Sequence, residues 1–263
     1  MRYCFLLLSI ALFVANVTGC GGSSSGTIPV SSPGTYPTLT GNWWLGPSSF
    51  VTGTTYDMGG YLTNTNGAVT GTLHTIEQGA NCYQIDQAIP ITGTITTDGT
   101  VSLTSAAVAN QIFSVRGDVL GGVLDGTYAI SGGCAAGESG TVIGELMPSL
   151  TGTYTGTFYP ASGAFTGATI TVTQSGPNAD GEFSLPGTAS FSGSPCFTTG
   201  TVTSSTVFGE YIQVTIGTDK GGVVQFTGLA AAVGSDDIFI DGSYAVTAGT
   251  CAGDTGSGVL NSS

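Results

Sequence analysis

The chain has 263 residues, of which 44 are glycine and only 7% are charged, and its 16 acidic residues outnumber three basic ones. This balance excludes nucleic acid as a partner, because phosphate binding needs a basic surface. It also differs from the charged, proline-rich composition of disordered chains. Abundant glycine with frequent threonine and serine is typical of strands joined by tight turns.

The N-terminal segment, residues 1–19, has the parts of an export signal: Arg2, an apolar run over 5–14, and small residues before Cys20. The run is too short for a membrane-spanning helix, which takes about 20 residues. Val17-Thr18-Gly19-Cys20 resembles the lipobox of bacterial lipoproteins, which implies cleavage before Cys20 and attachment of lipid to its thiol. An ordinary secretory signal with an incidental cysteine is the alternative.

Residues 20–37 are rich in glycine, serine and proline, and we expect them to form a flexible tether. Gly21, where an aspartate would retain a lipoprotein at the inner membrane, implies the outer membrane under the usual sorting rule of Gram-negative bacteria. The expected location is therefore the cell envelope, with the membrane as a partner through the lipid on Cys20.

The rest of the chain repeats itself. Leu39-Thr40-Gly41 returns as Leu150-Thr151-Gly152, and the segment 125–130 returns as 241–246, at offsets between 111 and 117 residues. Such ordered agreement predicts two homologous domains, over residues 38–147 and 149–263.

Within each copy the apolar residues recur with a period of two, as in the segment 150–158, and no helical period is present. Glycine-containing turn signals separate the runs: Asn66-Gly67, Asp98-Gly99, Gly121-Gly122, Asp180-Gly181 and Lys220-Gly221-Gly222. We predict an all-β protein with two tandem antiparallel meanders of about eight strands each. Each meander is barrel-like, because closure removes exposed edges, and a β-sandwich is the alternative.

Gly41-Asn42-Trp43 resembles the G-x-W motif of the lipocalin and calycin barrels, in which the tryptophan plugs the closed end. The second copy has Gly152-Thr153-Tyr154 instead, and the family's late arginine is missing from both copies. The resemblance implies a barrel-like meander and not lipocalin ligand binding. The chain is also similar to the glycine- and threonine-rich β-lipoproteins of environmental bacteria, which mostly lack an assigned activity.

Four cysteines remain once Cys4 leaves with the signal and Cys20 takes lipid: Cys82, Cys134, Cys196 and Cys251. An even number in an exported chain predicts two disulfides, with three possible connectivities. The duplication makes Cys82–Cys134 and Cys196–Cys251 the simplest pairing. In an eight-strand meander the two cysteines of a copy follow strands three and seven, so each bond is expected to tie one barrel mouth.

Catalytic and metal-binding signals are sparse. His74 is the only histidine, no G-x-S-x-G motif is present, and an alternating strand position predicts that His74 is exposed. We therefore predict no catalytic residue, no metal site and no cofactor.

Two acidic groupings remain as alternatives: Glu77 with Asp86 for glycoside hydrolysis, or Asp236 with Asp237 and Asp241 for hydrolysis or calcium. Acids that recur in both copies indicate turns, namely Asp125 with Asp241 and Glu138 with Asp254.

Trp43 and Trp44 point to opposite faces of a strand, so Trp43 is expected in the core and Trp44 outside. An outward Trp44 can stack on a sugar or lie against the other domain. The leading hypothesis is a lipid-anchored, non-enzymatic protein with a structural or interaction role. Its alternatives are a module that binds a small apolar ligand, a glycan or an envelope protein, and an enzyme of unfamiliar type.

Overall fold

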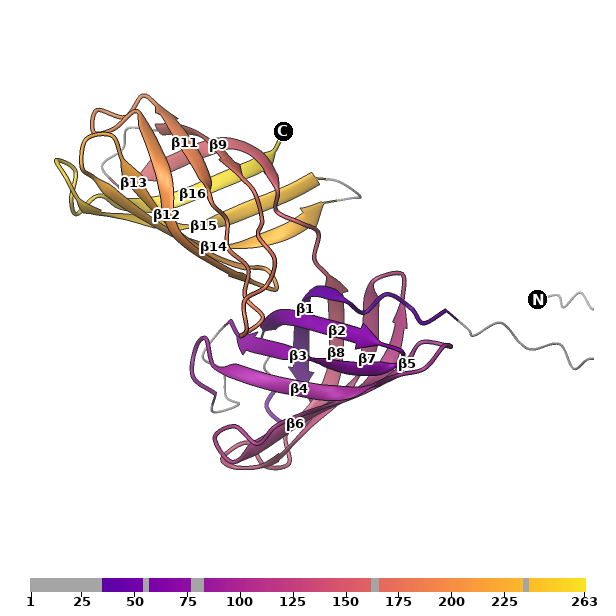
Figure 1. Cartoon of the computed structure of the whole chain (residues 1–263). Coiled ribbons are helices and arrows are strands. Elements are labelled where there is room, and N and C mark those ends of the chain that lie inside the picture. Colours follow the sequence, from indigo (N-terminus) through magenta and orange to yellow (C-terminus); the bar gives the residue numbers. More distant parts are fainter. Residues whose placement is uncertain (1–34, 54–56, 77–82, 162–165, 234–236) are drawn as a thin grey trace, which may run out of the picture. The chain divides into compact units, whose positions relative to one another are not determined.

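The computed structural model describes residues 35–263 except 54–56, 77–82, 162–165 and 234–236. Residues 35–263 form one compact unit, and its described residues contain sixteen strands (Figure 1). The described part of the chain holds no helix of the length and hydrophobicity needed to cross a membrane.

The first eight strands form a closed antiparallel barrel in which each strand pairs with the next. Pairing of the first strand with the eighth, from Trp43 opposite Leu146 to Ser49 opposite Gly140, closes the ring. The strands are β1 (Gly41–Ser49), β2 (Met58–Thr65), β3 (Ala68–Thr75), β4 (Ala88–Ile95), β5 (Thr100–Ser105), β6 (Gln111–Leu120), β7 (Val123–Gly132) and β8 (Ser139–Leu146).

The remaining eight strands repeat this arrangement, and the last of them pairs with the first, from Gly256 opposite Pro160 to Ser262 opposite Tyr154. They are β9 (Gly152–Pro160), β10 (Thr166–Val172), β11 (Gly187–Ser192), β12 (Thr199–Phe208), β13 (Tyr211–Thr218), β14 (Val223–Val233), β15 (Asp237–Ala248) and β16 (Thr255–Ser262). The predicted all-β fold with two tandem eight-strand barrels is confirmed, and the sandwich alternative is wrong.

Tight turns explain the simple strand order. Asn66 and Gly67 have φ angles of 53° and 87°, and Gly121 and Gly122 have 61° and 83°. Positive φ at both central residues is the geometry whose twist matches two paired strands. Where a turn is this short, the two strands that it joins must be neighbours, and in both barrels every strand pairs with the next one along the chain.

Each barrel is plugged by an aromatic residue near the start of its first strand. Trp43 is fully buried and its indole N–H donates to the carbonyl of Leu39 at 2.7 Å. Tyr154 is 3% exposed, and its hydroxyl donates to the carbonyl of Leu150 at 3.1 Å. The change from tryptophan to tyrosine in the second copy therefore keeps the same bond to a residue four positions earlier.

Side chains fill the barrels. Leu45, Leu62, Leu73 and Leu124 are fully buried in the first barrel. In the second barrel an apolar cavity of about 30 Å³ lies among core residues such as Ile170 and Phe226. That volume is close to the space of one water molecule, so it holds no larger ligand.

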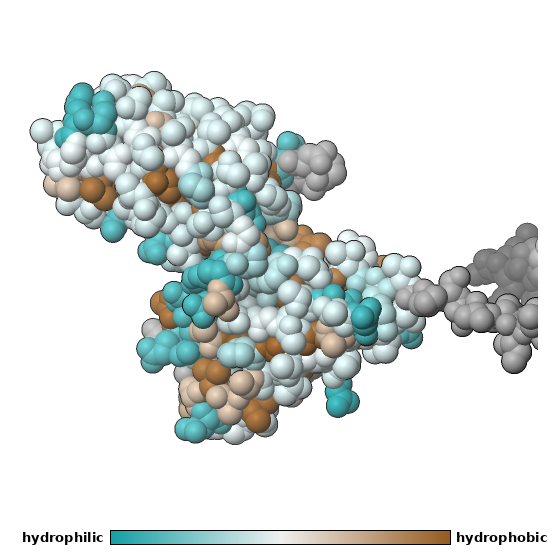
Figure 2. Space-filling model, viewed as in Figure 1, coloured by the Kyte–Doolittle hydropathy of each residue, from teal (hydrophilic) through white to brown (hydrophobic). Residues whose placement is uncertain are grey.

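The outer surface carries few strongly polar residues. Figure 2 shows a visible face dominated by residues of intermediate hydropathy, with small hydrophobic areas scattered among them. Only 7% of the residues are charged, and many outward strand positions carry threonine or serine instead, as in β5 and β10.

Candidate functional site: the barrel joint

The two barrels touch where the outer wall of β1, β2 and β3 meets one end of the second barrel. The Asn42 side-chain amide donates to the carbonyl of Gly209 at 2.8 Å, and the Gly209 N–H donates to Asn42 Oδ1 at 2.7 Å. Both bonds are buried and join residues 167 positions apart. We call the contact made by Asn42, Gly59 and His74 with Asp180, Phe208 and Gly209 the barrel joint.

Glycines allow the two backbones to approach closely. A Cβ atom on Gly59 would lie 2.4 Å from Gly209 Cα and 2.7 Å from the carbonyl oxygen of Phe208. These are backbone atoms of a packed contact and cannot move aside, so any side chain at position 59 would clash with them. The register places Trp44, Gly59 and His74 in one row on this outer wall.

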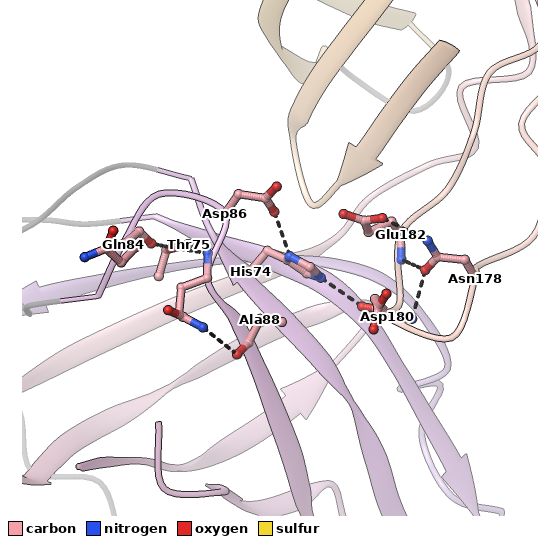
Figure 3. Close-up of polar contacts among 9 residues, drawn as sticks. His74, Thr75, Gln84, Asp86, Ala88, Asn178, Asp180 and Glu182 are labelled. Atoms are coloured by element: carbon pink, nitrogen blue, oxygen red, sulfur yellow. Dashed lines mark hydrogen bonds and ion pairs between the residues drawn. The ribbon is translucent and has the colours of Figure 1, made fainter. Parts of the chain in front are cut away.

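His74 is the most unexpected member of the joint. The predicted exposed strand histidine is wrong: His74 is 3% exposed. Its Nδ1 lies 2.8 Å from Asp86 Oδ1, and its Nε2 lies 2.8 Å from the backbone oxygen of Asp180 in the other barrel (Figure 3). The residue was assigned to the outside because alternation shows which way a side chain points, not what later covers it.

Aromatic rings complete the cover. The ring of Phe208 stacks on His74 with centroids 4.8 Å apart, and Tyr211 stacks on Phe208 at 4.7 Å. Tyr61 meets Phe183 edge to face at 5.6 Å across the same joint. Burial raises the pKa of Tyr211, and the negative charge of Asp86 adds to that rise.

Asp86 is held by a turn fastened to the end of β3. Its φ angle is 56°, its N–H donates to the carbonyl of Thr75 at 2.8 Å, and the next N–H, of Gln87, donates to Thr75 Oγ1 at 3.1 Å. Left-handed backbone is tolerated by aspartate better than by most residues. The turn thus fixes the carboxylate beside the imidazole while leaving it exposed to solvent.

The second barrel contributes the loop between β10 and β11, organised by Asn178. The Oδ1 atom of Asn178 accepts the N–H groups of Asp180 and Glu182 at 2.9 and 3.0 Å, and its amide donates to Glu182 Oε2 at 2.8 Å. Gly181 has a φ angle of 81° and lies close to the first barrel. A Cβ atom added to Gly181 would be 3.2 Å from the backbone oxygen of Thr72. The predicted turn at Asp180-Gly181 is confirmed, and it brings Glu182 to the joint.

His74, Asp86 and Glu182 form a convergent group. One nitrogen of the imidazole and one oxygen from each carboxylate all lie within 4.8 Å of one another. Figure 3 shows the two carboxylates directed towards one another beside the imidazole ring. Histidine nitrogen and carboxylate oxygen are ligands that divalent transition metals accept. Both ring nitrogens are engaged and the ring is buried, so His74 cannot reach a substrate as a general base in this arrangement.

The other predicted acidic groups are not assembled in this way. Glu77 and Asp236 lie outside the described residues, and Asp237 shares strand β15 with Asp241. Asp125 and Asp241 are exposed residues within β7 and β15, so the prediction that they form turns is wrong. They recur because both copies have an outward strand position there, opposite Asp118 and Leu229 respectively.

Trp44 points outward as predicted and is half-buried. Its indole N–H donates to Asp57 Oδ1 at 3.2 Å, and its ring covers Gly46 two positions along the strand. Asn42, its neighbour on the same face, makes the contact with the second barrel instead.

The cysteines mark the opposite end of the second barrel. Cys196 and Cys251 form a disulfide between the loops after the third and seventh strands of that barrel, as predicted. Cys134 is disulfide-bonded, whereas Cys82 and Cys20 lie outside the described residues. Because loops alternate between the two ends of a meander, this mouth lies at the far end from the β10–β11 and β12–β13 loops of the joint.

A pocket of about 420 Å³ opens at this disulfide-tied mouth, floored by Phe158, Phe197 and Tyr244. The hydroxyl of Tyr244 donates to Asp254 Oδ2 at 3.2 Å. Burial, followed by the charge of Asp254, raises the pKa of Tyr244 to about 12.

Glu182 was missed at the level of the sequence. It follows the turn signal Asp180-Gly181, but nothing in the spacing connects it to a histidine more than 100 residues earlier. The sequence pattern pairs Asp86 with Glu77 and not with His74.

No protein-family model and no curated protein matches the chain. Among solved structures, the chain is similar to kievitone hydratase from Nectria haematococca at a TM-score of 0.23 and 12% identity, over 90% of this chain and 94% of that one. A similarity this low carries no inference about chemistry. The fold and the joint therefore rest on the geometry above.

Proposed function

We propose that this is a lipid-anchored protein of the cell envelope with a structural or interaction role and no catalytic activity. The joint carries the structural part of the proposal, because it buries the only histidine of the chain with both ring nitrogens hydrogen-bonded. The barrels it connects are filled with side chains. The geometry supports a rigid two-barrel body rather than a reaction centre.

In this proposal, the cellular location is inferred from the lipobox-like residues 17–20. Lipid on Cys20 and the tether over 20–37 hold the two-barrel body at the membrane, with the outer membrane as the expected one. The experiment is Cys20→Ser with fractionation of the cell envelope and labelling with radioactive palmitate. We expect loss of label and release from the membrane fraction, while Cys4→Ser, within the signal, leaves both unchanged. Membrane retention of Cys20→Ser would refute the anchor.

Binding of a small apolar ligand or a glycan is the second candidate, and the pocket at the disulfide-tied mouth favours it. Phe158, Phe197 and Tyr244 offer aromatic faces, and Asp254 offers an acceptor, at a scale that fits a small ligand. Titration with neutral oligosaccharides and with fatty acids, followed by NMR, tests this candidate. Shifts confined to this mouth and lost in Phe197→Ala support it, and an absence of shifts at millimolar ligand contradicts it.

A further inference from the structure

We propose that His74, Asp86 and Glu182 bind a divalent transition-metal ion that bridges the two barrels. The first argument is the ligand set. One nitrogen and two carboxylate oxygens lie within 4.8 Å of one another, and they come from β3, the turn before β4 and the β10–β11 loop. Two ligands therefore belong to the first barrel and one to the second. This site is independent of the proposed anchoring function.

The orientation of His74 is the second argument. Metal-bound histidines commonly donate their other ring N–H to a carboxylate or a backbone carbonyl, which fixes the tautomer. Here Nε2 lies 2.8 Å from the Asp180 carbonyl oxygen, and Nδ1 faces Asp86. Phe208 stacks on the ring at 4.8 Å and holds its plane. The Asp180 carbonyl therefore already occupies Nε2, and Nδ1 is the nitrogen directed towards the ion.

Charge is the third argument. Two carboxylates converge beside one imidazole, and the basic residues of the described chain lie elsewhere: Arg116 on β6 and Lys220 in the β13–β14 turn. A divalent ion balances the charge of both carboxylates. Among the described residues, no lysine or arginine other than these two is present to neutralise the carboxylates.

Access and geometry allow the ion to enter. Asp86 is exposed and Glu182 is half-buried, so both carboxylates can be approached from solvent. With bonds of about 2.0–2.1 Å, tetrahedral ligands lie about 3.4 Å apart. His74 Nδ1 and Asp86 Oδ1 are 2.8 Å apart, so the ion enters between them after a small outward movement of Asp86. Three protein ligands leave the fourth position to water, and the single nitrogen favours zinc or manganese over calcium.

The test uses the full chain, stripped with a chelator and titrated with Zn²⁺ alone by calorimetry. We expect one ion per chain and an affinity that falls at least about tenfold in Asp86→Asn and in Glu182→Gln. Asparagine tolerates the left-handed backbone of Asp86, so Asp86→Asn removes charge without straining the turn. Glu145→Gln, which removes an exposed carboxylate on β8, is the matched control and keeps the affinity of the original chain.

A spectroscopic measurement identifies the ligating atom. Because His74 is the only histidine, ¹⁵N-histidine labelling gives the two signals of a single imidazole. Zinc is expected to move the Nδ1 signal and to leave Nε2 protonated. Three results would overturn the proposal: no binding at submillimolar zinc, unchanged affinity in both carboxylate variants, or zinc binding that leaves both imidazole signals where they were.

Discussion

Removal of the Asn42 side chain measures how strongly the barrel joint is held. In Asn42→Ala the N–H and C=O groups of Gly209 lose the side-chain partners that lie at 2.7 and 2.8 Å. Two intramolecular hydrogen bonds contribute about 1 kcal/mol each, and a buried group left without a partner costs about 1–3 kcal/mol. We therefore expect the joint to be weakened by about 2–4 kcal/mol.

Hydrogen exchange at the Gly209 amide reports this change directly. A weakening of about 2–4 kcal/mol corresponds to exchange that is about 30-fold to several-hundred-fold faster. Amides within the β3–β4 ladder serve as the internal reference, because the barrel itself stays closed. Asn64→Ala is the matched control, since its side chain accepts the Gly67 N–H within a turn of the same barrel. If Gly209 exchanges at the original rate in a folded Asn42→Ala protein, the reasoning about the joint is wrong.

Three further predictions concern the joint, the disulfide and the plug. Gly59→Ala places a methyl group 2.4 Å from the backbone of the second barrel. We therefore expect a larger radius of gyration in small-angle scattering and an unchanged circular dichroism spectrum. Gly176→Ala is the control, because nothing lies within 4 Å of its added Cβ, and it leaves both measurements unchanged. Cys196→Ser opens a 55-residue disulfide loop and should lower the free energy of unfolding by about 4 kcal/mol in urea titrations; a loss below about 1 kcal/mol would contradict this. Burial raises the pKa of Tyr154 to about 12, whereas an unfolded tyrosine titrates near 10. The contribution of Tyr154 to the free energy of unfolding is therefore complete below about pH 10 and is lost as the pH rises towards 12. In urea titrations, Tyr154→Phe should show a smaller loss of stability between pH 10 and 12 than the original chain. An equally steep loss in Tyr154→Phe would argue against a raised pKa of Tyr154.

The two plugs show how far local pattern reaches. Leu39-Thr40-Gly41 and Leu150-Thr151-Gly152 predicted equivalent strand starts, and the structure places Trp43 and Tyr154 there with equivalent bonds to Leu39 and Leu150. These contacts span four residues, so the repeat carries all the information they need. The cysteines of the second barrel were placed correctly for the same reason, because strand parity follows from counting turns.

The candidate site behaved differently. His74 was expected to be exposed, and Glu182 was not considered, because their meeting depends on one barrel packing against the other. Outward positions on the wall of a barrel look alike in sequence whether solvent or protein covers them. In the sequence, Gly59 cannot be distinguished from any other glycine in a strand. Its lack of a side chain nevertheless allows the backbone of the second barrel to approach this closely.

The all-β class, the duplication, the eight-strand meanders and the pairing of Cys196 with Cys251 could all be predicted from sequence patterns. These features depend on period-two alternation, on glycine turns and on strand order, all of which are local or follow from the repeat. The tertiary structure alone decided the joint and the group formed by His74, Asp86 and Glu182. The bonds that assemble it join residues 106 and 167 positions apart, and no local pattern encodes which two surfaces will exclude water from each other.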